Sequence, residues 1–237
     1  MKQDKIETAW SGAEKCETCG IRHLALFADL EHEDFVHIHN PIHEVVFKHG
    51  EALYHLESAA EHVYTVRSGL VKLVQYLPDG TPRIVRILRP GDLAGIEITT
   101  GGNYQHNAIA LTPVETCQIP MTVINTLSEE TPRLHRQLLE RWKNALITAD
   151  SWLTQLSTGT ARNRVINLLL WLDANTTQAD GSFTLPVRED IGAMVALTTE
   201  TVSRIVAELR RSDIVSMLPG QRARIDRDEL ALLIEEE

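Results

Sequence analysis

The 237-residue sequence predicts an α+β protein: an antiparallel β-roll, then one long helix, then a C-terminal helix–turn–helix followed by a β-hairpin wing. Three observations predict this order. Short apolar runs broken by glycines occupy roughly residues 33–120, helical patterns begin after Pro120, and residues 188–209 contain two helical patterns separated by a short turn. Regular short strands with glycine turns are typical of a β-barrel or β-roll.

Length and charge limit the class of protein. The chain is long enough for about two domains, each with its own core. A net charge of −10 argues against a broad surface that coats nucleic acid, but a small basic patch remains possible because only the charges that meet phosphate release counterions. The longest apolar run, Val165–Leu172, is too short to cross a bilayer, and the first residues lack the apolar core of a signal peptide. We therefore expect a cytoplasmic protein with no membrane partner.

The chain divides into four expected segments. They are a polar N-terminal segment with two cysteines (1–24), the β-roll (25–120), a helical region (121–158) and the C-terminal domain (159–237). Within the roll, Asp79-Gly80 between two apolar runs predicts a β-hairpin.

A long helix is predicted from Pro132 onward, because proline is well tolerated in the first turn of a helix. Apolar residues then recur every three or four positions, at Leu134, Leu138, Trp142, Ala145, Ala149, Trp152 and Leu156. Such a seam is typical of helix pairing between two copies of a chain. The alternative is a helix buried against its own β-domain. For pairing, the candidate contacts are Leu138, Trp142, Ala145, Ala149 and Trp152, and we expect a dimer even without a cofactor.

The C-terminal domain begins after Gly159. We expect a helix at 162–175, a strand at 183–187, the helix–turn–helix, and a hairpin over 215–226 that turns at Pro219-Gly220. The hairpin is interpreted as a wing.

The second helix of the helix–turn–helix has two distinct faces. From a start near Thr199, Val202, Ile205, Val206 and Leu209 form one apolar stripe that faces a core. Polar residues lie opposite, near the N-terminal end, where a recognition helix contacts base edges in the major groove. Arginine suits guanine and glutamate can accept from cytosine. The candidate DNA-binding residues are Glu200, Ser203, Arg204, Thr199, Thr198 and, on the wing, Arg222. An ordinary amphipathic helix is the alternative.

These features together resemble the CRP/FNR superfamily of bacterial transcription regulators, from about Cys16 to the C-terminal helix. Three stretches resemble its FNR (fumarate and nitrate reduction regulator) branch: LTTETVSR at 197–204, GDLAGIE at 91–97, and CETCGIRHL at 16–24 together with TCQIP at 116–120. The resemblance implies a cyclic-nucleotide-binding-like β-roll as the sensor. It also implies a homodimer that binds a TTGAT-like palindrome in double-stranded DNA, and RNA polymerase as a further partner.

The loop at 91–111 departs from the cyclic-AMP-binding members, which use a glutamate early in the loop and an Arg-Ser pair near its end. Here Ile96 takes the glutamate position and His106-Asn107 replace Arg-Ser. A buried cyclic phosphate without a positive partner would be poorly satisfied. We therefore expect no cyclic AMP binding.

Three cysteines are candidate metal ligands: Cys16, Cys19 and Cys117. In a cytosolic protein such spacing indicates metal or redox chemistry more than a structural disulfide, and the resemblance implies an iron–sulfur cluster that responds to redox state, oxygen or nitric oxide. The FNR branch has a further cysteine where this chain has Ala25, so the fourth ligand is unknown. The nearby candidates are His23, Asp29, Glu31 and His32.

Other sensing chemistries remain open. Three thiolates could hold a three-iron cluster, or Zn²⁺ with one histidine, and Cys16 and Cys19 could form a redox-sensitive disulfide. Histidines are dense between His23 and His62, so axial ligation of haem is a further alternative, as are a small organic ligand in the β-roll and the absence of any cofactor. No nucleophile elbow, P-loop or H-E-x-x-H motif occurs, so we expect no enzyme activity.

Overall fold

The computed structural model describes residues 26, 27, 29, 31 and 42–235, and these form two compact units. The first unit contains the described residues up to Val74 together with Ile87–Ile147. The second contains Gln75–Arg86 and the chain from Thr148 onward. The division falls inside the long helix α3 (Pro132–Leu156), whereas the predicted boundary lies after that helix, at residue 159.

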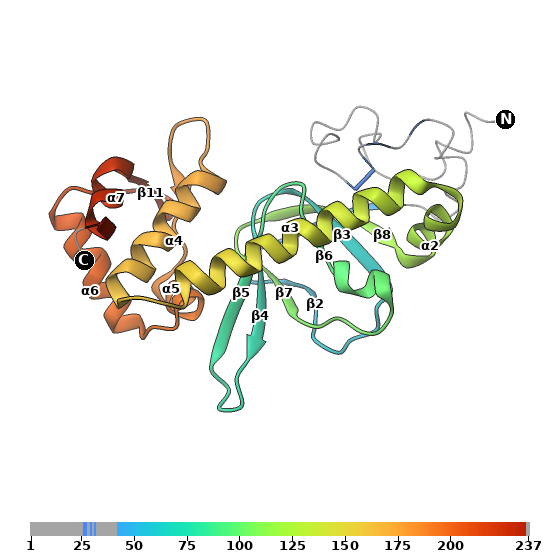
Figure 1. The fold of residues 1–237 in the computed structure, drawn as a ribbon, viewed down its shortest axis with the longest axis horizontal. Coiled ribbons are helices and arrows are strands. Elements are labelled where there is room, and N and C mark those ends of the chain that lie inside the picture. Colours follow the sequence, from blue (N-terminus) through green and yellow to red (C-terminus); the bar gives the residue numbers. More distant parts are fainter. Residues whose placement is uncertain (1–25, 28, 30, 32–41, 236–237) are drawn as a thin grey trace. The chain divides into compact units, whose positions relative to one another are not determined.

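The first unit is built on the predicted antiparallel β-roll (Figure 1). The roll has two four-stranded sheets, with the strand orders β1-β8-β3-β6 and β2-β7-β4-β5. The end of β4 and most of β5 lie in Gln75–Arg86, which belongs to the second unit. The strands are β1 (His43–Phe47), β2 (Ala52–Tyr54), β3 (His62–Ser68), β4 (Val71–Tyr76), β5 (Pro82–Leu88), β6 (Leu93–Ala94), β7 (Asn107–Ala110) and β8 (Val114–Pro120). A short 3-10 helix, η4 (Ile96–Thr100), lies between β6 and β7.

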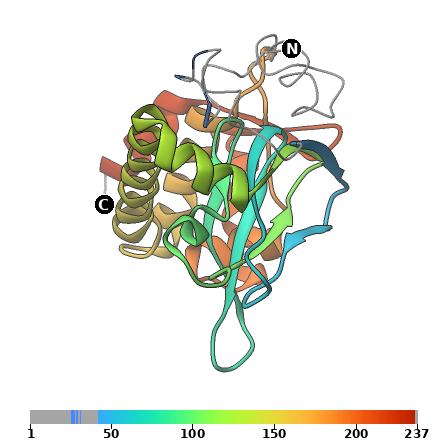
Figure 2. The ribbon, with the colours of Figure 1, turned by 90° about the vertical axis from the view of Figure 1, so that its right-hand side faces the viewer.

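The hairpin between β4 and β5 confirms the prediction made from Asp79-Gly80. Gly80 has a φ of +83°, and its N–H donates to the Leu77 carbonyl over 2.8 Å. The Asp79 carboxylate accepts the N–H of Thr81 over 2.9 Å. Figure 2 shows the loop that joins the two strands of this hairpin. The turn therefore has the positive φ and side-chain hydrogen bond that favour Asp-Gly at such a position.

Aromatic rings pack inside the roll beside η4. Tyr54 and Tyr104 are stacked with ring centroids 3.8 Å apart, and Tyr64 lies next to Tyr54 at 6.1 Å. The Tyr104 hydroxyl donates to the His62 carbonyl over 2.5 Å. Burial, with a smaller contribution from Tyr64, raises the pKa of Tyr104 to about 12. Tyr104 therefore remains a hydrogen-bond donor at physiological pH and fixes the chain after η4 to β3.

Two helices follow β8. The first, α2 (Met121–Glu130), ends at Thr131, whose N–H donates to the Leu127 carbonyl over 2.8 Å. Pro132 has no N–H to continue this helix and instead starts α3, as predicted. In the part of the chain that the structure describes, no helix is both long and apolar enough to cross a membrane.

The second unit contains the predicted helix–turn–helix and wing (Figure 1). Its elements are α4 (Ala161–Thr176), β9 (Phe183–Thr184), α5 (Arg188–Val195), α6 (Thr199–Arg211), β10 (Val215–Leu218), β11 (Arg222–Ile225) and α7 (Arg227–Glu235). The three strands form one antiparallel sheet in the order β10-β11-β9.

Strand β9 is shorter than the predicted strand over 183–187. Leu185 still donates its N–H to the Gln221 carbonyl over 2.8 Å. Pro186 has no N–H and therefore cannot extend the ladder. The chain leaves the sheet there and enters α5 at Arg188.

Candidate functional site

The turn between α5 and α6 is closed by a close backbone approach. A Cβ atom on Gly192 would lie 2.5 Å from the Leu197 carbonyl oxygen, so this position needs glycine. Ala196 ends α5 in the left-handed region, with a φ of +53°, and its N–H donates to the Gly192 carbonyl. The tight turn brings α6 against α5 and fixes the direction of the second helix.

Helix α6 begins at Thr199, as predicted, and buries the predicted apolar stripe of Val202, Ile205, Val206 and Leu209. Thr198 is its N-cap residue: the side-chain oxygen accepts the N–H of Thr201 over 3.2 Å. Such a cap satisfies a backbone donor of the first turn. The Thr198 hydroxyl therefore already has a structural role.

The opposite face of α6 is open to solvent. Thr199, Glu200, Ser203 and Arg204 are all exposed. The Glu200, Ser203 and Arg204 side chains make no hydrogen bond or ion pair with the described part of the chain. These are polar groups, held on a rigid helix, that an external partner can contact.

The predicted wing forms, but its arginine is engaged. Arg222 donates from Nη1 to Oδ2 of Asp180 over 2.8 Å, and from Nε to the Pro219 carbonyl over 3.3 Å. Arg224 donates from Nη2 to the Asp180 carbonyl over 2.8 Å. Both arginines on β11 therefore already contact the loop between α4 and β9.

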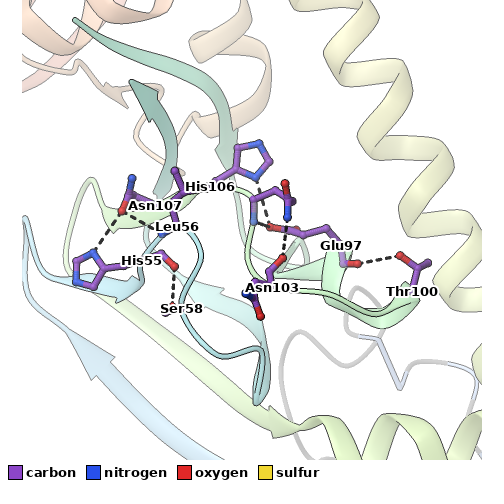
Figure 3. A network of polar contacts seen from close by, with 9 residues as sticks. His55, Leu56, Ser58, Glu97, Thr100, Asn103, His106 and Asn107 are labelled. Atoms are coloured by element: carbon purple, nitrogen blue, oxygen red, sulfur yellow. Dashed lines mark hydrogen bonds and ion pairs between the residues drawn. The ribbon is translucent and has the colours of Figure 1, made fainter. Parts of the chain in front are cut away.

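In the first unit, the chain through η4 to β7 forms a polar network, which we call the η4–β7 network: Glu97, Thr100, Asn103, Gln105, His106 and Asn107, with His55 and Leu56 (Figure 3). Its centre is the Glu97 carboxylate. Oε1 accepts the Gln105 N–H over 3.2 Å and lies 3.4 Å from Nδ1 of His106. The side chains of Glu97 and His106 are largely buried.

Burial by itself raises the pKa of Glu97, but the contacts with His106 and the Gln105 N–H outweigh burial and leave the pKa below its ordinary value. Glu97 is therefore ionised at neutral pH. The preceding residue, Ile96, is buried and apolar. Nearby, the side-chain oxygen of Asn107 accepts the N–H of Leu56 over 3.2 Å and lies 3.3 Å from His55 Nδ1. The network is thus satisfied from within the chain around one negative charge.

The long helix α3 divides the predicted seam between two faces. Leu138 and Trp152 are only 9% and 5% exposed, and Trp152 packs edge-on against Trp171 of α4 at 5.3 Å. These two predicted dimer contacts therefore pack against their own chain. Trp152 contacts α4 of the second unit, not the β-domain that the alternative interpretation named. Trp142 and Ala149 are exposed, and Ala145 is half-buried.

Sequence reasoning missed an exposed leucine stripe on α3. Leu139, Leu146 and Leu153 are 64%, 63% and 65% exposed. They are spaced seven residues apart, which is the heptad repeat of paired helices. The signal was present in the sequence, but a pattern of mixed threes and fours led to a seam that combines exposed positions with the buried Leu138 and Trp152.

Of the predicted metal ligands, Cys16, Cys19, His23 and His32 lie outside the described residues. Cys117 is half-buried on β8, where Glu44 of β1 and Thr65 of β3 are its strand neighbours. Asp29 accepts from Gln137 over 2.5 Å, and Glu31 pairs with Arg133 over 2.8 Å. No group of three or more His, Cys, Asp or Glu side chains is placed to hold a metal within residues 42–235 and the few described residues before them.

Comparison with known proteins agrees with this architecture. Residues 44–131 match the cyclic nucleotide-binding domain, and residues 163–233 match the Crp-like helix-turn-helix domain. The nitrogen fixation regulation protein FixK of Bradyrhizobium diazoefficiens is 30% identical, over 89% of this chain and 90% of that protein. The transcriptional activator protein anr of Pseudomonas aeruginosa is 28% identical, over 92% and 91%. The structure of FixK2 from Bradyrhizobium japonicum matches with a TM-score of 0.74 and 28% identity, over 81% of this chain and 96% of that one.

These relatives are transcription regulators and not enzymes, and regulators of this kind bind DNA and act as dimers. The order of the two matched domains is the order of the two units found here. The chain therefore belongs to the CRP/FNR family of transcription regulators.

Proposed function

We propose that the protein is an FNR-type regulator that binds a TTGAT-like palindrome as a homodimer and contacts bases through Glu200, Ser203 and Arg204. The observation that carries the proposal is the exposed polar face of α6, whose side chains have no partner within the described chain. An arginine and a glutamate near the start of such a helix match the acceptors of guanine and the amino donor of cytosine. RNA polymerase is the further partner expected of such a regulator.

The proposed dimer contact is the exposed stripe of α3, with Leu139, Leu146 and Leu153 at one heptad position and Trp142 and Ala149 at the other. Large apolar side chains that are nearly two-thirds exposed favour burial against a partner. Two recognition helices must lie about one DNA turn apart to read both halves of a palindrome. Pairing along α3 is the proposed way to hold them together.

The proposed signal is redox state, oxygen or nitric oxide, sensed through Cys16, Cys19 and Cys117. Two relatives support a role in anaerobic regulation. They are a fumarate and nitrate reduction regulatory protein of Vibrio cholerae and an anaerobic regulatory protein of Haemophilus influenzae. Three thiolates are suitable donors for an iron–sulfur cluster, which would supply a redox-sensitive or oxygen-sensitive state. A four-iron cluster needs a fourth ligand that is not a cysteine of this chain.

Contacts in the first unit connect the residues that follow Cys16 and Cys19 to α3. Leu26 and Phe27 are buried, while Asp29 and Glu31 bind Gln137 and Arg133 in the first two turns of the helix. These residues follow the two N-terminal cysteines closely in sequence. A change at the cysteines that shifts this segment would therefore alter its contacts with α3, and such differential contacts are required of any ligand-driven switch.

The η4–β7 network supports the expectation that cyclic AMP is not a ligand. A cyclic phosphate needs a positive partner, whereas here an ionised carboxylate, Glu97, lies at the centre of the network. The alternative functions keep the same DNA-binding role, with control by haem, a thiol switch or a small organic ligand. Iron, sulfide and zinc analysis of protein purified without air separates these alternatives from the cluster.

The DNA proposal is tested by measuring binding to a TTGAT palindrome and to single-base variants of it. Arg204→Ala is expected to lower affinity for the palindrome by about 1–3 kcal/mol and to relax preference at one base position. Arg211→Ala is the matched control, because Arg211 lies on the same helix in its last turn. Equal losses on every sequence for Arg204→Ala would contradict base readout by this residue, and the absence of a symmetric footprint would contradict the whole proposal.

A further inference from the structure

Asp180 holds both arginines of the wing strand β11. It lies in the loop between α4 and β9, which we call the 177–182 loop. Its Oδ2 accepts from Nη1 of Arg222 over 2.8 Å, and its carbonyl oxygen accepts from Nη2 of Arg224 over 2.8 Å. One acidic residue therefore engages the two cations that the wing could otherwise offer to a phosphate.

The loop is built to keep this carboxylate in place. The Ser182 N–H and hydroxyl both donate to Oδ1 of Asp180, over 3.0 and 2.6 Å, and Ser182 is fully buried. The Gln178 N–H donates to the Ser182 carbonyl over 2.7 Å, which closes the loop. One oxygen of Asp180 is thus used for loop structure and the other is directed to Arg222.

Asp180 carries its charge under all physiological conditions. Hydrogen bonds from Ser182 lower the pKa of its carboxyl group, and the nearby Arg222 and Arg224 lower it further. The contact with Arg222 is nevertheless open to exchange, because the two side chains are 35% and 44% exposed. Ion pairs exposed to this degree are weak, so a DNA phosphate can compete for the same guanidinium.

We propose that Asp180 acts as an intramolecular competitor of DNA phosphates for Arg222 and Arg224, and so limits the sequence-independent part of DNA affinity. The proposal rests on the proposed DNA binding. No lysine follows Lys143 in this chain, so arginines supply the cationic side chains with which the second unit can meet phosphate. Non-specific affinity comes from such phosphate contacts. Asp180 lowers this background because its carboxylate occupies Arg222 and its carbonyl oxygen occupies Arg224, while base readout by α6 is retained.

The test compares Asp180→Asn with Asp173→Asn. The first change keeps a side-chain acceptor for Ser182 and removes the charge beside Arg222. The second removes the same charge from another ion pair of this unit, between Asp173 of α4 and Arg227 of α7, whose Nε and Oδ2 are 3.4 Å apart. Binding of a random-sequence duplex and of the palindrome is measured by fluorescence anisotropy at several salt concentrations.

We expect Asp180→Asn to bind the random duplex roughly threefold to tenfold more tightly at low salt, and its plot of log K against log salt to be steeper by about one. Asp173→Asn should leave the slope unchanged. Adding Arg222→Ala to Asp180→Asn should return the slope to that of the unmodified protein.

An unchanged or shallower slope for Asp180→Asn overturns the proposal. If Asp180→Asn does not fold, the salt dependence of DNA binding by the single variant Arg222→Ala tests the proposal instead. If Asp180 already holds Arg222, removing this arginine from the otherwise unmodified protein should hardly change DNA affinity or its salt dependence. A change of about one in the slope of log K against log salt for Arg222→Ala therefore also overturns the proposal. If the unmodified protein binds neither duplex, the proposed function itself has failed; if it binds and only the Asp180→Asn slope stays constant, the failure is confined to Asp180.

Discussion

The outer face of α6 and the η4–β7 network are both polar, but they differ in where their hydrogen bonds go. Glu200, Ser203 and Arg204 have no partner in the described chain. Glu97 and His106, by contrast, contact each other and the backbone around them. A buried polar group needs hydrogen-bond partners within the protein, whereas an exposed polar group can bind water until a ligand replaces it.

This difference supports the proposal that α6 meets the external partner, whereas the network belongs to the scaffold. The match to the cyclic nucleotide-binding domain, over residues 44–131, includes the network, but a shared fold does not imply a shared ligand. If the distinction holds, the function of α6 depends on an external partner, whereas the network depends only on its own chain.

The largest expected effect concerns pairing, because one α6 face reads only half of a palindrome. Leu146→Asp places a charge in the middle of the exposed heptad stripe of α3, where a partner helix would bury it. We expect a monomer in analytical ultracentrifugation and a loss of palindrome affinity of at least about 100-fold, since the second half-site no longer adds to the first.

The matched control is Gln155→Asp, which adds the same charge to the same helix away from the stripe. Gln155 is exposed and lies off the seven-residue spacing of the leucines. A dimer that survives Leu146→Asp would show that α3 does not pair through this face.

The long helix also shows how far the sequence alone could be read. Its start at Pro132 and its apolar character were predictable from local rules, as were the apolar stripe of α6 and the Asp79-Gly80 turn. Which apolar residues of α3 face their own chain was not predictable, because burial of Leu138 and Trp152 depends on neighbours distant in sequence. Two apolar faces on one helix give overlapping periodicities in the sequence. Only the packing of the folded chain shows which face is buried and which is exposed.

The polar contacts escaped sequence reasoning for a similar reason. Arg222 was assigned to DNA from its place on the wing, but its partner Asp180 lies 42 positions earlier in the chain. The role of Thr198 as the cap of α6 could have been found, since a threonine before an amphipathic pattern is a helix start signal.

The next effect concerns the support beneath α6. Gly192→Ala places a Cβ atom 2.5 Å from the Leu197 carbonyl oxygen, so the turn between α5 and α6 must move. We expect a loss of about 1–3 kcal/mol in the free energy of unfolding of the second unit, as for other overpacked positions. Denaturant unfolding followed by tryptophan fluorescence measures this, because Trp152 and Trp171 pack together in that unit. Unchanged stability would mean that the turn relaxes at no cost.

The η4–β7 network should make a smaller, pH-dependent contribution. The lowered pKa of Glu97 means that its ionised form is favoured in the folded state. This stability is present above the ordinary glutamate pKa, about 4.3, and is lost as pH falls through the lowered value. We expect Glu97→Gln to cost about 1 kcal/mol at pH 7 and to remove part of the acid sensitivity.

DNA affinity offers a second measurement on the same variant. If the network is scaffold only, Glu97→Gln should leave palindrome binding by the dimer unchanged at pH 7. Addition of cyclic AMP should shift the melting temperature of neither protein. A shift in the unmodified protein that Glu97→Gln abolishes would show instead that the network is a ligand site.

The smallest effect is expected at Ala196, which ends α5 with a φ of +53°. A left-handed backbone costs little for glycine but strains residues with a Cβ atom. We expect the strain that Ala196→Gly relieves in the folded state to exceed the cost of the extra conformational entropy that glycine gives the unfolded chain. Ala196→Gly should therefore stabilise the second unit by about 0.5–1 kcal/mol. Its effect is opposite in sign to that of Gly192→Ala, although both residues belong to the same turn. If both variants were destabilised, the conformation assigned to this turn would be wrong, and with it the rigid presentation of the α6 face on which the comparison with the η4–β7 network depends.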